Sequence, residues 1–217
     1  PYNRRIVLEA IRQHGPIARG DIAGRVGLTV QTVSNIIREL EEQGFIIAAV
    51  RDAPKSRGYP ATNLSINPDG GYAIGINITP LGLEAALINL AGEVVAREQR
   101  KLSHPSPEAA FSEIFALVEE FKNIKLGRRM LGIGLAMPGP FDVESMSFVG
   151  PTTLEGWKGV PVQQRLAEGS GLPAFIEVDH AAAALGERLY GAGKNFRGFY
   201  DLDFGVGLVG GMVLDGV

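Results

Sequence analysis

The chain has 217 residues, 45% of them hydrophobic, and a formal net charge of −3, which is enough for one large or two smaller globular domains. It contains no cysteine, which excludes disulfides, thiolate nucleophiles and cysteine-based zinc sites from these residues. No apolar run approaches the roughly 20 residues of a membrane span, and the chain begins without the apolar stretch of a secretory signal, so we expect a cytoplasmic protein with no membrane partner.

Charge is distributed unevenly along the chain. Residues 1–67 carry nine Lys and Arg against six Asp and Glu, whereas residues 68–217 carry twelve against eighteen. A small basic module therefore precedes an acidic body. This split favours a nucleic-acid contact in the first part, although uneven surface charge is also common in proteins that bind no nucleic acid.

The first part of the chain predicts three helices. Apolar residues at helical spacing indicate helices over residues 3–14 and 19–26, and a tight turn follows the second. A third helix begins at Thr29, whose hydroxyl can cap it, and ends at Gly44. Its inward face carries the apolar residues Val33, Ile36, Ile37 and Leu40.

The other face of the third helix carries short polar and amide side chains near its N-terminal end. In a helix-turn-helix, the second helix of the pair enters the major groove by its first turns, where Gln and Asn can pair with adenine and Arg with guanine or phosphate. The alternative is an ordinary three-helix bundle with a solvated polar face. We predict that the residues in contact with DNA are Thr29, Gln31, Thr32, Ser34, Asn35 and Arg38.

A basic hairpin follows the three helices. Residues 46–50 and 62–66 predict two short strands, and the segment between them places Arg51, Lys55 and Arg57 among Gly and Pro. Such a tip can lie along phosphates or reach into a minor groove, so Lys55 and Arg57 join the predicted DNA contacts. Helices and hairpin in this order predict a winged helix-turn-helix domain over residues 1–67.

From residue 68 onward the pattern changes to an alternation of strands and helices. The first three strands follow one another closely and predict a meander, and the whole is typical of an α/β domain. In chain order, we predict strands over residues 72–78, 83–89 and 94–100, a helix over 107–121, a strand over 130–135, a helix over 162–167, a strand over 174–178, a helix over 181–190 and a hairpin over 198–214.

Three motifs in this second part carry a family resemblance: GIGLAMPGP at residues 132–140, GWKGVP at 156–161 and EVDHAAAALGE at 177–187. With a winged helix ahead of them, they resemble the ROK family of repressors and sugar kinases. The resemblance implies that residues 68–217 form part of an actin-like, hexokinase-like (ribonuclease H-like) α/β domain, truncated at its C-terminal end. It also implies a homodimer or higher homo-oligomer that binds double-stranded operator DNA and releases it when a sugar or sugar derivative binds.

The chain departs from the family's kinases where they hold ATP. The kinases open the fold with Asp-Ile-Gly-Gly-Thr, which serves metal and phosphate, and the matching residues 77–81 read Asn-Ile-Thr-Pro-Leu. A second phosphate turn, Gly-Thr-Gly in the kinases, is matched by Phe-Gly-Val-Gly at residues 204–207, whose glycines fit a tight hairpin as well as a phosphate loop. Because phosphoryl transfer depends on positioned phosphates and metal, we predict no enzymatic activity, no catalytic residue, no cofactor and no metal.

The resemblance also implies an effector site. The kinases bind the sugar with an Asn-Asp pair, and here the pair is Val178-Asp179, whose valine cannot hydrogen-bond a hydroxyl. Each of these residues also has a simpler role. Asp179 can be a helix N-cap, His180 can be a surface or capping residue, and Pro138 and Gly139 can merely shape a turn. Trp157 is predicted to pack at the mouth of the cleft. The predicted effector contacts are Pro138, Gly139, Asp179 and His180.

These patterns are compatible with three functions. The leading hypothesis is a transcriptional repressor with a catalytically degenerate domain that senses a sugar. One alternative is a DNA-tethered sugar kinase that keeps Asp179 as its base. The other is a DNA-binding protein whose kinase-like body is only an oligomerisation scaffold. The residues identify neither the effector nor the operator sequence.

Overall fold

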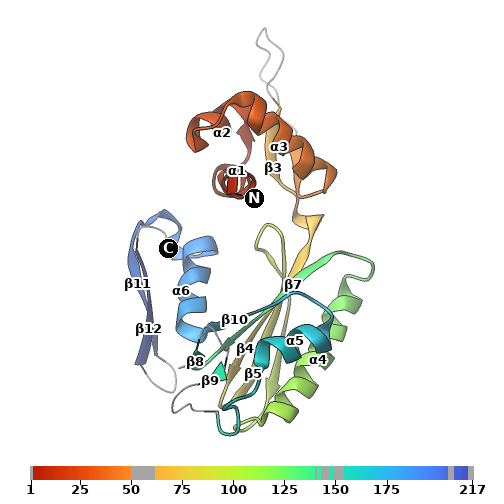
Figure 1. Ribbon diagram of the computed structural model, residues 1–217, viewed down its shortest axis with the longest axis vertical. Coiled ribbons are helices and arrows are strands. Elements are labelled where there is room, and N and C mark those ends of the chain that lie inside the picture. Colours follow the sequence, from red (N-terminus) through yellow and green to blue (C-terminus); the bar gives the residue numbers. More distant parts are fainter. Residues whose placement is uncertain are drawn as a thin grey trace. The chain divides into compact units, whose positions relative to one another are not determined.

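The computed structural model describes residues 2–49, 62–139, 141–142, 147–148, 154–204 and 208–214. The chain divides into two compact units (Figure 1). Unit 1 comprises Pro1–Tyr72 with Asn89–Glu93, and unit 2 comprises Ala73–Ile88 with Val94–Val217. Within the described ranges, none of the helices combines the length and apolar character that crossing a membrane requires.

Unit 1 has three helices and a small sheet among its described residues. The predicted helices are confirmed to within a residue at their starts, and the two strands of the hairpin are present. The predicted wing tip, residues 51–60, lies outside the described residues. In chain order the elements are α1 (Tyr2–His14), β1 (Ile17–Ala18), α2 (Arg19–Val26), α3 (Val30–Glu42), β2 (Ile46–Ala49) and β3 (Asn63–Ile66), followed by the 3₁₀ turn η1 (Pro68–Gly70).

The sheet of unit 1 contains a strand that the sequence analysis missed. Strand order is β1-β3-β2, with β3 antiparallel to both neighbours. β1 has only two residues, too few to show an alternation of apolar and polar side chains, and pairs Ile17 with Leu64. Its contribution to the hydrophobic core comes through Ile17, which is 6% exposed.

One apolar core joins the three helices to this sheet. The inward face of α3 carries Val33, Ile37 and Leu40, all fully buried as the helical spacing predicts, while Ile36 is half-buried. The buried residues that complete the core are Val7, Ala10, Ile11, Ile17, Ile22, Ala23, Ile46 and Leu64. The core therefore holds α3 by one face only, and its polar face is turned away from the apolar contacts.

Removal of the Ile37 side chain tests this core. Because Ile37 is fully buried, Ile37→Ala should lower the free energy of unfolding by about 2–5 kcal/mol, measured by urea denaturation followed by circular dichroism. Ile47→Ala, at a side chain that is 44% exposed on β2, is the matched control and should cost less than about 1 kcal/mol. An equal cost at both positions would contradict the packing described.

The second part of the chain is an α/β domain. The predicted strands and helices are present, with α4, β7 and α5 longer at their C-terminal ends than the sequence suggests. The elements are β4 (Tyr72–Thr79), β5 (Gly82–Asn89), β6 (Val94–Lys101), α4 (Pro107–Ile124), β7 (Met130–Met137), β8 (Phe141–Asp142), β9 (Ser147–Phe148), α5 (Val162–Ser170), β10 (Ala174–Val178), α6 (Asp179–Tyr190), the 3₁₀ turn η2 (Ala192–Asn195), β11 (Phe199–Phe204) and β12 (Leu208–Val213).

Five strands form the main sheet of this domain, in the order β10-β7-β4-β5-β6. β10 runs parallel to β7, and β5 is antiparallel to β6. The predicted meander of β4, β5 and β6 is therefore one edge of a larger sheet. Two further antiparallel pairs, β8–β9 and β11–β12, lie outside it, and the second pair packs on α6.

The two faces of the main sheet have different surroundings. Ile74, Ile76 and Ile78 of β4 are buried on the face covered by α4 and α5 (Figure 1). Because successive side chains of a strand point to opposite faces, Asn77 and Thr79 belong to the other face, which those helices leave open. The open face is where a ligand can reach the sheet.

Trp157 lies in the core and not at the mouth of a cleft, so its predicted position is wrong. Its side chain is fully buried. The indole Nε1 donates a hydrogen bond of 2.9 Å to the carbonyl oxygen of Pro105, and the ring centroid lies 5.8 Å from that of Phe111 on α4. A large aromatic side chain whose one polar atom finds a partner gains most by full burial.

Candidate functional site

The N-terminal end of α3 is built by a side-chain cap, as the sequence predicts. Thr29 has extended backbone angles, φ −69° and ψ 150°, and its Oγ1 accepts a hydrogen bond of 3.2 Å from the backbone N–H of Thr32. The two threonine hydroxyl oxygens lie 2.9 Å apart. This cap satisfies one of the free N–H groups of the first turn and fixes where the helix begins.

The predicted DNA-contacting residues of α3 fall into two groups. Thr29, Gln31, Asn35 and Arg38 are exposed, whereas Thr32 and Ser34 are half-buried. Gln31 Nε2 donates to Asn35 Oδ1 at 3.3 Å, so these two amides lie side by side one turn apart. The structure thus presents a row of amide and guanidinium groups on the face opposite the core, while Lys55 and Arg57 lie outside the described residues.

Val30 also belongs to this end of α3, and the sequence analysis missed it. It is the first residue of the helix and its side chain is 54% exposed. Its spacing from Val33 and Ile37 fits the apolar face, so periodicity alone groups it with the core. It is exposed because the helix begins there, beyond the elements that pack on α3.

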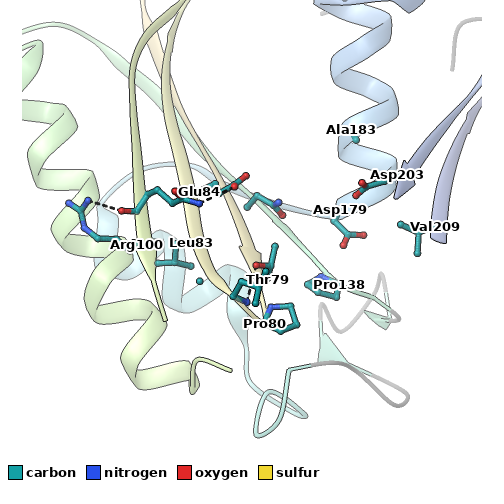
Figure 2. A pocket seen from close by; sticks show the side chains of 14 residues that line it. Thr79, Pro80, Leu83, Glu84, Arg100, Pro138, Asp179, Ala183, Asp203 and Val209 are labelled. Carbon is teal, nitrogen blue, oxygen red and sulfur yellow. Dashed lines mark hydrogen bonds between the residues drawn. The ribbon is translucent and has the colours of Figure 1, made fainter. Parts of the chain in front are cut away.

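The second candidate site is a cleft of about 630 Å³ within unit 2. Figure 2 shows Thr79, Pro80 and Pro138 at one end of it, with Asp179 and Ala183 of α6 and Asp203 and Val209 of the β11–β12 hairpin across from the sheet. The described residues that line the cleft are Asn77, Thr79, Pro80, Leu81, Gly82, Leu83, Glu84, Gln99, Arg100, Pro138, Asp179, Ala183, Asp203 and Val209.

The structure brings only some of the predicted effector residues to this cleft. Pro138 and Asp179 line it, whereas Gly139 and His180 are not among the described lining residues. His180 instead lies beside Asp179, with its Nδ1 3.1 Å from Asp179 Oδ1. A turn residue and a carboxylate that are 41 positions apart in sequence therefore line one cleft.

Asp179 is not the N-cap of α6, which corrects one of its predicted alternatives. Val178 occupies the cap position, with no side-chain cap bond, and Asp179 is the first residue of the helix. Its Oδ1 nevertheless accepts a hydrogen bond of 2.7 Å from the backbone N–H of His180. The carboxylate thus stabilises the helix start from inside the first turn, where negative charge is favoured by the helix dipole.

Six polar residues of the cleft were not predicted as ligand contacts, and Asn77, Glu84 and Asp203 are among them. The Oδ1 atom of Asn77 is buried and has no hydrogen-bond partner among the residues that the structure describes. Such an atom costs about 1–3 kcal/mol relative to a bonded one. The sequence held a signal for Asn77, because it lies between Ile76 and Ile78 in a strand and must leave the apolar face. The same signal marks Glu84, which lies between Leu83 and Ala85 of β5, but no comparable signal marks Asp203.

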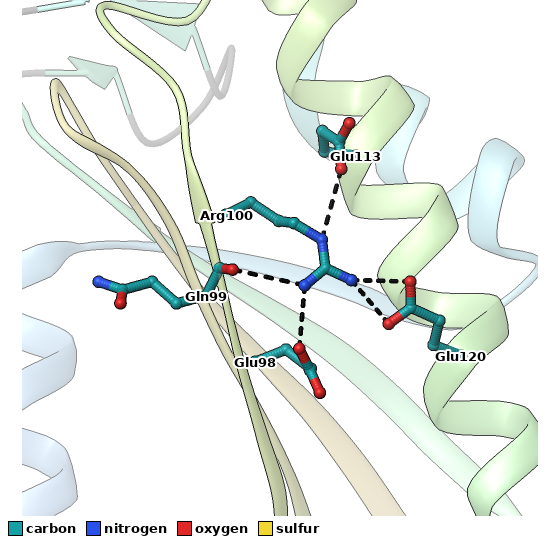
Figure 3. Close-up of polar contacts among 5 residues, drawn as sticks. All are labelled: Glu98, Gln99, Arg100, Glu113 and Glu120. Carbon is teal, nitrogen blue, oxygen red and sulfur yellow. Dashed lines mark hydrogen bonds and ion pairs between the residues drawn. The ribbon is translucent and has the colours of Figure 1, made fainter.

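Arg100 borders the cleft, but its guanidinium is paired with glutamates of β6 and α4 (Figure 3). Its Nη2 donates two hydrogen bonds of 2.7 Å to Glu120 of α4, its Nη1 donates one of 2.9 Å to Glu98, and its Nε lies 3.5 Å from Glu113. The hydrogen bonds that Arg100 donates to Glu120, and then the one to Glu98, raise the pKa of the guanidinium above its ordinary value.

These features define a winged helix-turn-helix joined to an α/β domain with a sugar-kinase-like motif set. The chain belongs to the ROK family, whose model matches residues 73–217. A model described as "Winged helix-turn-helix DNA-binding" matches residues 2–47. The chain spans about half the length of the curated relatives it matches.

The relatives include both regulators and kinases. The xylose repressor of Caldicellulosiruptor bescii is 29% identical over 98% of this chain and 54% of its own length. A solved ROK family transcriptional regulator, described as a homologue of Escherichia coli Mlc, superposes with a TM-score of 0.79 at 26% identity, covering 99% of this chain and 54% of its own. The ROK hexokinase of Thermus thermophilus has a TM-score of 0.58 at 25% identity over 67% of this chain and 48% of its own.

The cap of α3 is open to a direct test. Thr29→Ala removes the oxygen that accepts from Thr32 N–H, so the free energy of unfolding should fall by about 1 kcal/mol, whereas Thr29→Ser keeps that oxygen and should cost less than half as much. Urea denaturation measures both. Equal losses in the two variants would mean that the methyl group of Thr29, and not its hydroxyl, stabilises the helix.

Proposed function

We propose that this protein is a DNA-binding transcriptional repressor whose ROK domain senses a sugar or sugar derivative, and that α3 is the recognition helix. The observation that carries the proposal is the row of exposed Gln31, Asn35 and Arg38 on the first turns of a capped helix whose other face is fixed by the core. The similarity to proteins named xylose repressor supports the same reading.

Each residue of the α3 surface has a role that its chemistry suits. Gln31 and Asn35 offer amide groups for adenine, and Arg38 suits guanine or phosphate. Val30 can pack against the methyl group of thymine. The remaining proposed contacts, which would position the protein on the sugar-phosphate backbone, are Thr29, Thr32, Ser34, Lys55 and Arg57.

The cleft of unit 2 is the proposed effector site. Asp179 lines it and can accept hydrogen bonds from ligand hydroxyls, beside Pro138. We place Gly139 and His180 in a supporting role next to these two residues. On this proposal residues 1–67 bind the operator, residues 68–217 sense the effector, and the protein acts as a homodimer or higher homo-oligomer. A body that served only as a scaffold would have no use for a cleft lined by three carboxylates.

The proposed function does not include phosphoryl transfer. The one feature in favour of a kinase is Asp179 in the cleft of a hexokinase-like domain, where a base would stand. Against it, Asn77 occupies the position where the kinases have a metal-binding carboxylate. Asp203 adds a carboxylate beside the second phosphate turn, where it would repel ATP phosphates.

Loss of the α3 amide and guanidinium groups should abolish specific DNA binding. The variant Gln31→Ala/Asn35→Ala/Arg38→Ala should bind a duplex from the protein's own promoter region at least a hundredfold more weakly at fixed salt, since each good base contact is worth about 1–3 kcal/mol. Fluorescence anisotropy measures the affinity.

Arg5→Ala is the control for the lost positive charge. Arg5 is exposed on α1, and its neighbour in sequence, Arg4, hydrogen-bonds Gln43 at the C-terminal end of α3. Gln43 lies about 20 Å along the helix from Gln31, so Arg5 belongs to the end of unit 1 away from the proposed contacts. This variant should lose less than threefold in affinity. Equal losses in the control and the triple variant would rule out α3 as the recognition helix.

The absence of kinase activity is a separate prediction. With ATP, magnesium and a panel of sugars, the protein should form no sugar phosphate above the rate without protein, because the carboxylate and glycines that hold metal and phosphates are replaced. Product is detected by mass spectrometry. Turnover that disappears in Asp179→Asn would establish the kinase alternative.

A further inference from the structure

We infer that the cleft of unit 2 takes an uncharged, hydroxyl-rich ligand and rejects phosphorylated sugars. This inference rests on the proposed function, since it names the class of effector that the same cleft would sense. Three observations carry it: the signs of the charges around the cleft, the engagement of Arg100, and the kind of hydrogen-bonding atoms that the cleft presents.

Carboxylates dominate the charge of the lining. Glu84 of β5, Asp179 of α6 and Asp203 of β11 come from three separate elements and reach the same cleft (Figure 2). Glu84 and Asp203 are exposed and Asp179 is half-buried. A phosphate ester carries close to two negative charges at neutral pH, so each of these carboxylates would repel it, most strongly where the ligand displaces water.

Arg100, the one cation among the described lining residues, does not offset them. It pairs across strands with Leu83, whose side chain is buried on the α4 face, whereas Glu84 pairs with Gln99. The guanidinium therefore leaves the sheet on the face opposite to Glu84. There it meets Glu98, Glu113 and Glu120, and this carboxylate set already exceeds its single charge (Figure 3).

The start of α6 is also not open to an anion. A helix N-terminus attracts negative charge through its free N–H groups and its dipole. In α6 the chain's own carboxylate already lies at the N-terminal end, because Asp179 Oδ1 accepts a hydrogen bond of 2.7 Å from the His180 N–H. A ligand phosphate at this end would have to displace a negative charge that is covalently part of the helix.

Several acceptor atoms in the cleft can bind a ligand that donates hydrogen bonds. The carboxylates of Glu84, Asp179 and Asp203 only accept, and one oxygen of Glu84 already accepts from Gln99 Nε2 at 3.4 Å. Asn77 Oδ1 is a buried acceptor without a partner in the described part of the chain. A neutral sugar brings a hydroxyl hydrogen for each of these atoms, whereas an ionised phosphate brings more acceptors. The stretches next in sequence, residues 140–153 and 205–207, contain no Lys or Arg that would change the balance.

Matched ligand pairs test the inference. Isothermal titration of the protein compares D-glucose with D-glucose 6-phosphate and N-acetyl-D-glucosamine with its 6-phosphate, and D-xylose is titrated alongside. At least one neutral sugar should bind, and its phosphate ester should bind at least about tenfold more weakly. An ester that binds as tightly as its neutral sugar overturns the inference, and so does a protein that binds none of these sugars.

A charge reversal separates the cleft from the protein's overall charge. Asp203→Lys should reduce the ratio between ester and neutral-sugar affinity at least threefold, because it replaces a repelling group with an attracting one. Glu168→Lys makes the same change in total charge on α5, which covers the other face of the sheet, and should leave the ratio unchanged. The same ratio in both variants overturns the assignment of the discrimination to the cleft.

Asn77→Leu provides a readout that a purely structural role would not give. It removes the unpartnered acceptor at nearly constant volume, so affinity for the neutral sugar should fall about tenfold while thermal stability without ligand stays equal or rises. A fall in stability with unchanged affinity contradicts the role given to Asn77. Duplex binding without sugar is measured in parallel, so that a failure of DNA binding is recognised separately from a failure of this inference.

Discussion

The alternation of side chains across the five-stranded sheet is the constraint on which the second half of the molecule depends. α4 and α5 require an apolar surface beneath them, and the sheet supplies it with Ile74, Ile76 and Ile78 of β4. Every residue between these is therefore directed to the open face. Asn77 lines the cleft because of that constraint. By the same alternation, the side chain of Arg100 lies on the α4 face of the sheet and that of Glu84 on the other face.

A corresponding constraint shapes the first half. The core of unit 1 fixes α3 by Val33, Ile37 and Leu40, and the cap at Thr29 fixes where the helix begins. Once one face and one end of a helix are fixed, the direction of every other side chain follows. The exposed amides of the first turns are thus held by rigid apolar contacts, which is the arrangement that reading a base sequence requires.

Under the proposed function, a kinase-like fold binds a sugar without phosphoryl transfer, and the chemistry of the cleft suits that use. A kinase must attract ATP phosphates and metal as well as sugar, and so must place positive charge and backbone N–H groups near its carboxylates. In the part of this cleft that the structure describes, the lining has three carboxylates and one cation, and the guanidinium of that cation, Arg100, is bound to glutamates. A site of this kind can recognise hydroxyl groups, which is what the proposed sensing of a sugar requires.

The sequence by itself determined the helices, the longer strands, the family and the polar face of α3, because periodicity, turn residues and the motifs at residues 132–140 and 177–187 are local signals. The two-residue strands β1, β8 and β9 are too short to give such a signal. The sequence analysis misplaced Trp157 and did not single out Val30 as an exposed residue, since burial depends on which elements pack nearby. It also could not join Asp203 to Asn77, which are distant in the chain and meet only through the packing of α6 and the hairpin. Local pattern decides what a segment becomes, whereas long-range packing decides which side chains share a site.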